Sequence, residues 1–295
     1  ADLAARTLAH GRRLAADRAD ITAALARAGV PYRPLKGAWT VAWWSPPEAR
    51  PMADTDLFVA PARLADAARA LAGLGYAPAG RTWKHDAYLR PDNRLVVDPR
   101  GEHPDNPRPV ELHGSLGEAL RGVAWPGPSA REAIAADGGD AAALAHVLAH
   151  ASVDILERRL RLVTLVDVAR LRAALDEAVW ERALGMMAGP AAARLAWPAL
   201  ALAERERAMA PPAGARSLAA AVRPALHRWL AAVDVDAVAR LGGGEAAHGF
   251  LELAAVWPLD ARERRAIWRH AVLPGRWQLA DRYPALAASR AWPLV

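Results

Sequence analysis

The chain has 295 residues, of which 53% are hydrophobic, so it can bury one large core or two modest ones. It contains no cysteine, which excludes disulfides, thiolate zinc sites and cysteine nucleophiles. No secretory signal pattern is visible and no apolar run approaches the ~20 residues of a membrane span, so we expect a cytoplasmic protein. The net charge of +6 suits an anionic partner such as a nucleotide, a phosphorylated substrate or RNA.

The first half of the chain predicts alternating helices and strands. Apolar residues recur at helical spacing from Ala1 to Ala28, which predicts one or two amphipathic helices that end at Gly29. Turn-rich stretches then separate short apolar runs from helical ones. The expected strands are 32–35, 55–59, 82–89, 95–98 and 109–113, and the expected helices are 37–44 and 62–74.

The second half has a different pattern. Beyond Gly127 no strand pattern is present, and Ala- and Leu-rich helical patterns cover 141–156, 161–175, 179–187, 191–209 and 217–230. Pro and Gly accumulate between the two halves, so we place a domain boundary near residue 128. The expected fold is α+β, with a small mixed β-sheet domain in 1–128 and an all-helical domain in 129–295 that closes over it.

Two carboxylates stand at the entry to an apolar strand. The segment RPMADTDLFV places Asp54 and Asp56 two residues apart, and such residues of a strand point to the same face. Hard divalent cations such as Mg²⁺ prefer oxygen ligands of this kind. Acidic pairs beside strands also cap turns, so the pair alone does not define a site.

Two further segments make the pattern more specific. Upstream, PYRPLKGAW is a strand-like run that ends in Lys36 and Gly37 before a helix, where backbone amides and the lysine are candidates to bind phosphates. Downstream, RPVELHGSL places Glu111 in a later strand, with its apolar neighbours facing the opposite side. A metal site built from three carboxylates is therefore a reasonable hypothesis.

The ordered segments resemble the polymerase-β-like nucleotidyltransferase superfamily, and more closely an uncharacterised bacterial branch of it. The resemblance rests on LKG at 35–37, RPMADTDLFV at 50–59, VELH at 110–113 and a helical stretch that carries His150 and Asp167. It spans about residues 30–172. From roughly residue 185 onward, the chain matches only in being helical.

The resemblance implies transfer of a nucleoside monophosphate from a nucleoside triphosphate to an acceptor, with release of pyrophosphate. Asp54 and Asp56 would bind Mg²⁺ or Mn²⁺ in a two-metal mechanism, and ATP is the expected donor. Glu111 would complete the metal site and is a candidate to accept the acceptor's proton. Asp98, which follows the apolar run LVV, is a rival third carboxylate that we consider weaker.

Arg50 and His150 are further candidates for nucleotide binding. Arg50 lies four residues before the first aspartate and suits a triphosphate, although an ion pair with Asp54 or Glu48 is an equal alternative. His150 belongs to a helix face with His146 and Asp154. That face suits either a metal site or histidines hydrogen-bonded at a domain interface, and the resemblance brings His150 near the phosphates.

Asp167 and His113 are expected to support the site or to contact a substrate. Asp167 lies in an apolar helix and needs a partner if it is buried, for which we expect Arg158, Arg161 or His150. His113 shares a strand face with the third carboxylate, where it would contact the nucleotide or acceptor or make a structural hydrogen bond.

The acceptor is left open by the sequence: a small molecule, a peptide or protein side chain, or a tRNA end all fit, and the basic charge slightly favours an anionic one. One alternative is a toxin-type nucleotidyltransferase that acts on RNA. Another is a degenerate fold that serves as a nucleotide-binding or regulatory module. Three mutually repelling acids at one point argue against this last alternative, because binding alone does not need them.

Overall fold

A computed structural model describes residues 2–97, 103–120, 123–135, 139–236, 257 and 260–272. Asp98, the rival third carboxylate, lies outside these residues. Among the helices within them, none has the length and apolar character that a bilayer span requires.

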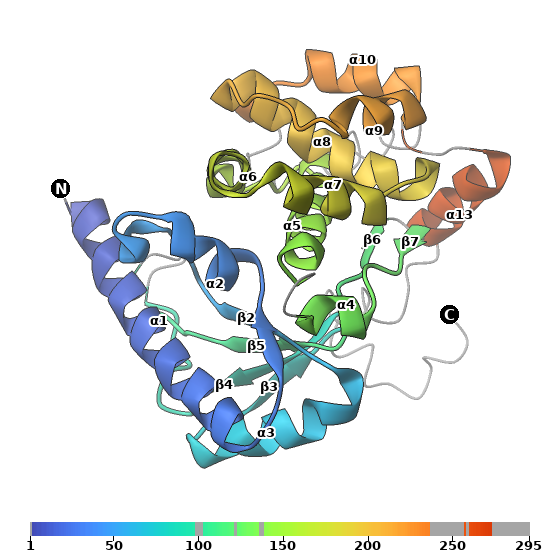
Figure 1. The fold of residues 1–295 in the computed structure, drawn as a ribbon. Coiled ribbons are helices and arrows are strands. Elements are labelled where there is room, and N and C mark those ends of the chain that lie inside the picture. The colour runs from blue at the N-terminus through green and yellow to red at the C-terminus, as the bar shows by residue number, and fades with distance from the viewer. Residues whose placement is uncertain are drawn as a thin grey trace.

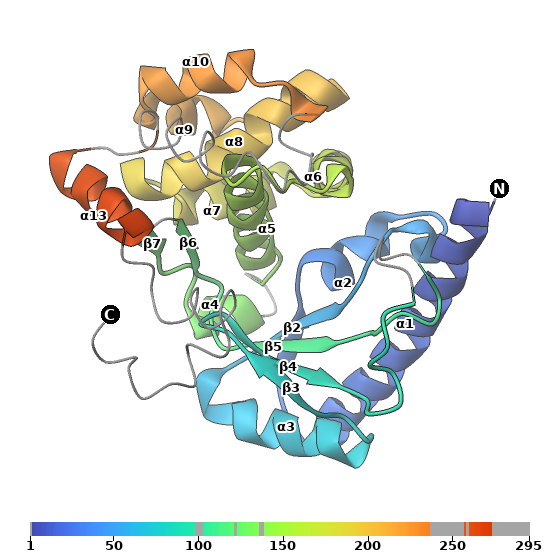
Figure 2. The same cartoon turned by 180° about the vertical axis from the view of Figure 1, so that it is seen from behind.

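The N-terminal part consists of a long helix and a mixed five-stranded sheet (Figures 1 and 2). Helix α1 (Asp2–Arg27) precedes a sheet with the strand order β1-β2-β5-β4-β3. The strands are β1 (Tyr32–Pro34), β2 (Thr55–Val59), β3 (Ala77–Arg81), β4 (His85–Leu89) and β5 (Val110–His113). Strands β2 and β5 are parallel, and the other neighbouring pairs are antiparallel.

The two faces of the sheet have different roles because side chains alternate along each strand. Helices α1 and α3 (Leu64–Gly73) cover one face, where Ile21 and Leu71 share an apolar core with Leu57 and Leu112 of the central strands (Figure 1). The residues between these apolar positions, including Asp56, therefore face the opposite side. Helix α2 (Lys36–Thr40) and the helical part of the chain lie on that side (Figure 2).

Short elements connect the principal ones. Among the described residues of the N-terminal part, three segments form 3-10 turns: η1 (Val41–Trp43), η2 (Pro47–Ala49) and η3 (Pro61–Arg63). A hairpin of β6 (Glu118–Leu120) and β7 (Val123–Trp125) leads to α4 (Ala130–Ile134). Ser129 and Glu132 form a capping box at the start of α4.

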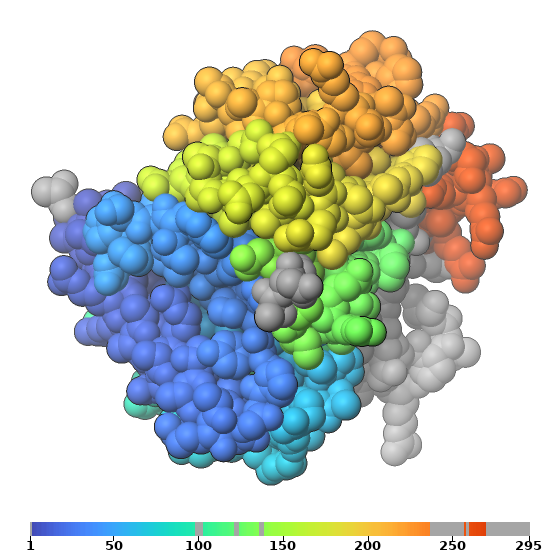
Figure 3. All heavy atoms as spheres, viewed as in Figure 1, coloured from blue at the N-terminus to red at the C-terminus, as the bar shows by residue number. Residues whose placement is uncertain are grey.

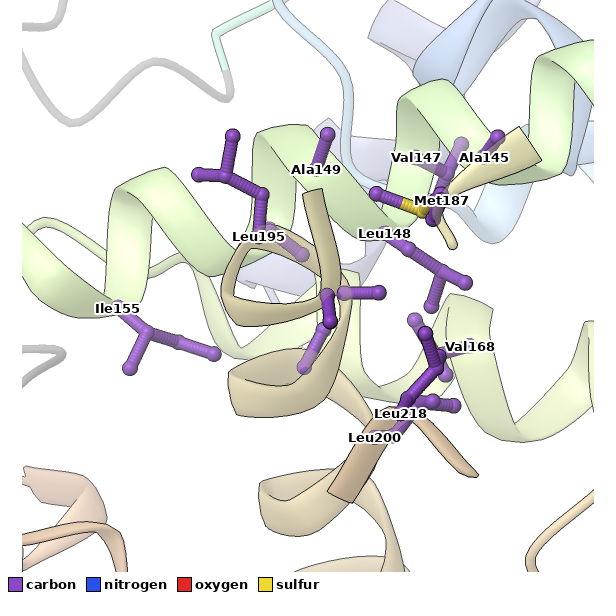
Figure 4. Close-up of a cluster of buried hydrophobic side chains, with 14 of the residues drawn as sticks. Ala145, Val147, Leu148, Ala149, Ile155, Val168, Met187, Leu195, Leu200 and Leu218 are labelled. Atoms are coloured by element: carbon purple, nitrogen blue, oxygen red, sulfur yellow. The ribbon is translucent and has the colours of Figure 1, made fainter. Parts of the chain in front are cut away.

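The C-terminal part is helical and packs around α5. Its helices are α5 (Gly139–Leu156), α6 (Leu162–Ala174), α7 (Glu177–Met186), α8 (Pro190–Arg207), α9 (Ala215–Ala221), α10 (Pro224–Ala232) and α13 (Ala261–Val272). Nearly every residue of α5 is buried, as expected for a helix surrounded by others. Figure 4 shows Leu148 of α5 pointing into a cluster with Val168, Leu200 and Leu218 from other helices.

The α+β fold with a mixed sheet and a helical C-terminal region is confirmed. The expected strand at 95–98 is wrong in its described portion, because Leu95–Val97 have no strand conformation. Their hydrophobic side chains are exposed, so the apolar run does not mark a buried strand. Strand β3 was not expected, since APAGR has a weak strand pattern and four exposed residues.

The single helix expected at 217–230 is also wrong. It is divided into α9 and α10, and Pro224 begins the second helix. Proline lacks a backbone N–H and disfavours helical geometry in the residue before it, so Arg223 is extended. The expected helix 37–44 is shorter than predicted, and it continues as the 3-10 turn η1.

Candidate active site

The pairing of β2 with β5 brings together three carboxylates that are distant in sequence. Asp56 and Glu111 are direct partners across these parallel strands, so their side chains lie on the same face. Asp54 immediately precedes Thr55, the first residue of β2. Ligand oxygens of Asp54, Asp56 and Glu111 all lie within 4.8 Å of one another. Three carboxylates grouped this closely are a set that could hold a metal ion.

Asp56 is held as a carboxylate by a partly buried lysine and a fully buried histidine. Lys36 Nζ lies 2.9 Å from Asp56 Oδ1, and His113 Nε2 lies 2.7 Å from the same oxygen. Asp56 is 2% exposed, and burial by itself would raise its pKa. The charge of Lys36 and the hydrogen bond with His113 overcome this effect and keep the pKa of Asp56 well below its ordinary value.

Asp54 has the opposite electrostatic behaviour although it is two residues away. Burial, followed by the charges of Asp56 and Glu111, raises the pKa of Asp54 to about 7. The charges of Lys36 and Arg161 act against this increase without cancelling it. The carboxylates therefore repel one another, and a bound cation would relieve this repulsion.

These carboxylates line a cavity of about 520 Å³ between two walls. The sheet wall consists of Lys36, Gly37, Asp54, Asp56 and Glu111, with Arg50 and Met52 beside them. The helix wall comes from α5, α6 and the segment between them, and includes Val147, His150, Asp154, Arg159, Arg161 and Thr164. The space-filling view shows the helical part lying directly against the N-terminal part (Figure 3).

Arg50 and Asp167 form a buried ion pair that joins the two walls. Arg50 Nε lies 3.1 Å from both carboxylate oxygens of Asp167, and its Nη2 also donates to Oδ2. Trp44 Nε1 donates a further hydrogen bond to Oδ1 of the same carboxylate, at 2.8 Å. Arg50 and Asp167 are 7% and 2% exposed, so the pair is largely removed from water.

This pairing corrects two sequence-based expectations. Asp167 pairs with Arg50, which was not among the three expected candidates, Arg158, Arg161 and His150. Arg50 pairs with Asp167 and not, among the ion pairs of the described residues, with Asp54 or Glu48, which the sequence offered as an alternative to phosphate binding. Sequence distance hid the partner, because Arg50 and Asp167 are 117 residues apart.

Gly37 permits Arg50 to approach the start of α2. A Cβ atom at Gly37 would lie 2.3 Å from Arg50 Nη1 and 3.0 Å from Met52 Sδ. A side chain at this position would therefore push against a guanidinium that Asp167 holds in place. The glycine is explained by close packing, and its backbone remains part of the cavity wall.

His150, which is part of the helix wall, lies between the carboxylates of Glu118 in β6 and Asp154 in α5. Its Nδ1 is 3.3 Å from Glu118 Oε1, and its Nε2 is 3.5 Å from Asp154 Oδ2. Glu118 is fully buried and also pairs with Lys84. Burial would raise the pKa of Glu118, but His150 and Lys84 together hold it well below its ordinary value. This arrangement orients the imidazole that lines the cavity.

His146 hydrogen-bonds outside the helix rather than joining a metal cluster. Its Nδ1 lies 3.0 Å from the carbonyl oxygen of Leu116, and burial lowers its pKa to about 3. Within the described part of the chain, the sets of three closely spaced metal-ligand atoms do not include His146, His150 and Asp154 together. The neighbouring helix histidines therefore match a structural arrangement better than a zinc site.

His113 lies behind the carboxylates and is fully buried. Burial opposes protonation, but hydrogen bonds with Asp56 and Glu111 raise the pKa of His113. Sequence reasoning missed His85, Lys84 and Glu118. Nothing in the sequence marks Glu118 as a site residue, because it lies in the three-residue strand β6 and meets its partners only in the folded chain.

A comparison with protein families matches more than half of the chain. A family model described as "Uncharacterised nucleotidyltransferase" matches residues 3–206. Comparisons with curated proteins and with solved structures found no match. The matched span runs from α1 to the end of α8, so both walls of the cavity lie within it.

Proposed function

The chain belongs to a family of uncharacterised nucleotidyltransferases, and from this premise we propose that it transfers a nucleoside monophosphate from a nucleoside triphosphate to an acceptor, releasing pyrophosphate. The observation that carries the proposal is the convergence of Asp54, Asp56 and Glu111 on one side of a cavity. We assign these three residues as the metal-binding and catalytic carboxylates. Phosphoryl-group chemistry depends chiefly on positioning and on stabilising charge, which such a cluster can supply.

The residues present fit a hard divalent cation. All three donors are carboxylates, which suit Mg²⁺ and Mn²⁺, and their repulsion is expressed in the raised pKa of Asp54. When bound, such ions supply Lewis-acid activation of the attacking group and stabilise charge on the departing pyrophosphate. The backbone pairing of β2 with β5 holds two of the carboxylates side by side, so little rearrangement is needed to bind a cation.

Residues on both walls are candidates to bind the nucleotide. Lys36, Gly37, Arg50 and His150 all line the cavity, and we assign them to the triphosphate side of the site. Arg50 is held by Asp167 and presents a guanidinium of fixed orientation, which suits phosphate oxygens. In this proposal the nucleotide lies between the domain formed by 1–128 and the one formed by 129–295, with ATP as the first donor to test.

The test is a titration of the purified protein with ATP, GTP, CTP and UTP in the presence of Mg²⁺ or Mn²⁺. Thermal shift reports binding, and pyrophosphate release reports transfer or hydrolysis. Asp54→Asn should abolish metal-dependent pyrophosphate release. Asp20→Asn is the matched control, because it makes the same chemical change at an exposed position of α1.

The proposal predicts a shift with at least one triphosphate that depends on the metal and is lost in Asp54→Asn but kept in Asp20→Asn. Equal pyrophosphate release by the wild type and Asp54→Asn would contradict the assignment of this carboxylate. Metal-independent binding without pyrophosphate release, with candidate acceptors present, would instead favour a nucleotide-binding module.

A further inference from the structure

A second group of potential metal ligands lies on β4 and β5, beside the carboxylate cluster. His85 and His113 are direct partners across these antiparallel strands, and Glu111 is two residues before His113. All three side chains therefore project from the same face of the sheet. Nitrogen atoms of the two histidines and a carboxylate oxygen of Glu111 lie within 4.8 Å of one another.

The spacing of these atoms is close to that of ligands around one ion. His85 Nδ1 lies 3.1 Å from Glu111 Oε2, and His113 Nε2 lies 3.6 Å from the same oxygen. Ligand atoms about 2.1 Å from a common ion are roughly 3.0–3.5 Å apart in octahedral or tetrahedral geometry. Small side-chain movements would bring all three atoms into such a sphere.

Hydrogen bonding does not account for the position of His85. Its Nδ1 is buried and makes no hydrogen bond to any part of the chain that the structure describes, although Glu111 Oε2 is only 3.1 Å away. The contact has the distance of a hydrogen bond without its alignment. A buried polar atom without a partner is unfavourable, and an ion between the nitrogen and the carboxylate would satisfy both groups.

We propose that His85, Glu111 and His113 bind a divalent transition-metal ion of the Mn²⁺, Co²⁺ or Zn²⁺ type, at a position adjacent to the carboxylate site. Imidazole nitrogens favour such ions, whereas Mg²⁺ prefers oxygen ligands alone. Glu111 belongs to both clusters and would bridge the two positions. The ion would replace the hydrogen bond that His113 Nε2 now makes with Asp56 Oδ1 at 2.7 Å.

The inference deepens the proposed function and rests on it only for the role of Glu111 as a shared ligand. It makes the two metal positions chemically different, one with oxygen ligands and one with two nitrogens. An enzyme with such a pair should bind Mn²⁺ or Co²⁺ more tightly than Mg²⁺. The side chains of His85 and Glu111 are 16% and 17% exposed, which leaves a route for an ion to enter.

The experiment uses Co²⁺ as a spectroscopic probe of the full chain without nucleotide. Equilibrium dialysis gives the dissociation constant and stoichiometry, and the visible absorption bands report the ligands. His85→Gln should weaken Co²⁺ binding by at least tenfold and change its spectrum. His227→Gln is the matched control, because His227 lies in α10 and bonds to the carbonyl oxygen of Ala219.

Identical Co²⁺ affinity and spectra in the wild type and His85→Gln would overturn the proposal. Pulsed EPR of the Mn²⁺-loaded wild type provides a measurement that does not depend on the folding of a variant. Coupling of Mn²⁺ to ¹⁴N nuclei is expected when two Mn²⁺ ions are bound per chain, and its absence at that stoichiometry would also overturn the site.

Asp54→Asn separates this proposal from the enzymatic one. This substitution should abolish pyrophosphate release. It should preserve the Co²⁺ spectrum that depends on nitrogen ligands, because Asp54 is not one of the three proposed ligands, His85, Glu111 and His113. A wild type that releases no pyrophosphate but binds Co²⁺ through nitrogen would reject the proposed function and support the metal site. A wild type that releases pyrophosphate, but whose Co²⁺ affinity and spectrum do not change in His85→Gln, would support the proposed function and reject the metal site.

Discussion

The two walls of the cavity neutralise their acidic residues in different ways. On the helix wall, Asp154 lies near both His150 and Arg159, and Asp167 is paired with Arg50. On the sheet wall, three carboxylates gather around a contact between Asp56 and Lys36, and burial together with their mutual repulsion raises the pKa of Asp54. Each of these two acids of the helix wall thus lies beside a histidine or an arginine, with Arg50 coming from the sheet wall, whereas the sheet wall holds three carboxylates close together beside one lysine.

The difference follows from how each wall is built. Parallel pairing of β2 with β5 forces Asp56 and Glu111 to be neighbours, regardless of their repulsion. On the helix wall, the acidic side chains are not fixed beside one another by strand pairing, and long basic side chains from other segments can reach them. Carboxylates that repel one another can therefore be kept close together only by a rigid backbone, here the paired strands. The following predictions test this contrast, beginning with the largest expected effect.

Asp56→Asn should have the largest effect because it alters both catalysis and charge balance. Pyrophosphate release should fall at least about 100-fold, as expected when an electrostatic contact to the reacting group is lost. Lys36 would lose its buried carboxylate partner, and the free energy of unfolding should fall by about 3 kcal/mol. Enzyme assays and chemical denaturation would measure the two effects. An unchanged stability would contradict the importance of the Lys36 contact.

Arg50→Met should destabilise the protein by about 3 kcal/mol, because it leaves Asp167 buried without its cation. The double variant Arg50→Met/Asp167→Leu should recover part of this loss, since it removes both charges. Denaturation of the two single variants and the double variant forms a thermodynamic cycle. Strictly additive losses would show that the pair is not energetically coupled.

Gly37→Ala should reduce stability by ~1–3 kcal/mol and weaken triphosphate binding. The added methyl group would meet Nη1 of the Arg50 guanidinium, whose Nε and Nη2 are held by Asp167. Gly73→Ala is the control, because a Cβ atom at that position has no neighbour within 4 Å. Thermal unfolding with and without nucleotide would distinguish the two variants. Equal behaviour would mean that Arg50 moves aside without consequence.

Asp54→Asn should stabilise the metal-free protein by up to about 4 kcal/mol at pH 7 and above, because a pKa raised from 3.8 to about 7 corresponds to about 1.4 kcal/mol for each tenfold change in the acid constant. The folded-state pKa of about 7 lies above the ordinary value of 3.8, so ionised Asp54 disfavours folding. This penalty is absent below about pH 4, grows between pH 4 and 7, and is complete above pH 7. The stability difference between variant and wild type should therefore increase over that interval in chelator-treated samples. A difference that is constant with pH would contradict the raised pKa.

The sequence predicted the elements whose pattern is local and strong. The acidic pair before the apolar run LFV, the strand at VELH and the long helices of the second half all correspond to elements of the structure. Weak or short patterns were less informative, as the exposed strand β3 and the hairpin of β6 and β7 show. An apolar run was also misleading at Leu95–Val97, where the side chains remain exposed.

The sequence by itself determined the α+β pattern, the family resemblance and the three acidic residues proposed to bind metal. These depend on residue type and spacing within short segments, where backbone periodicity decides which side chains share a face. Only the tertiary structure decided the partners: Arg50 for Asp167, Glu118 and Lys84 near His150, and His85 beside Glu111. Such pairs join segments far apart in the chain, and their energies depend on burial and on distances that no local pattern records.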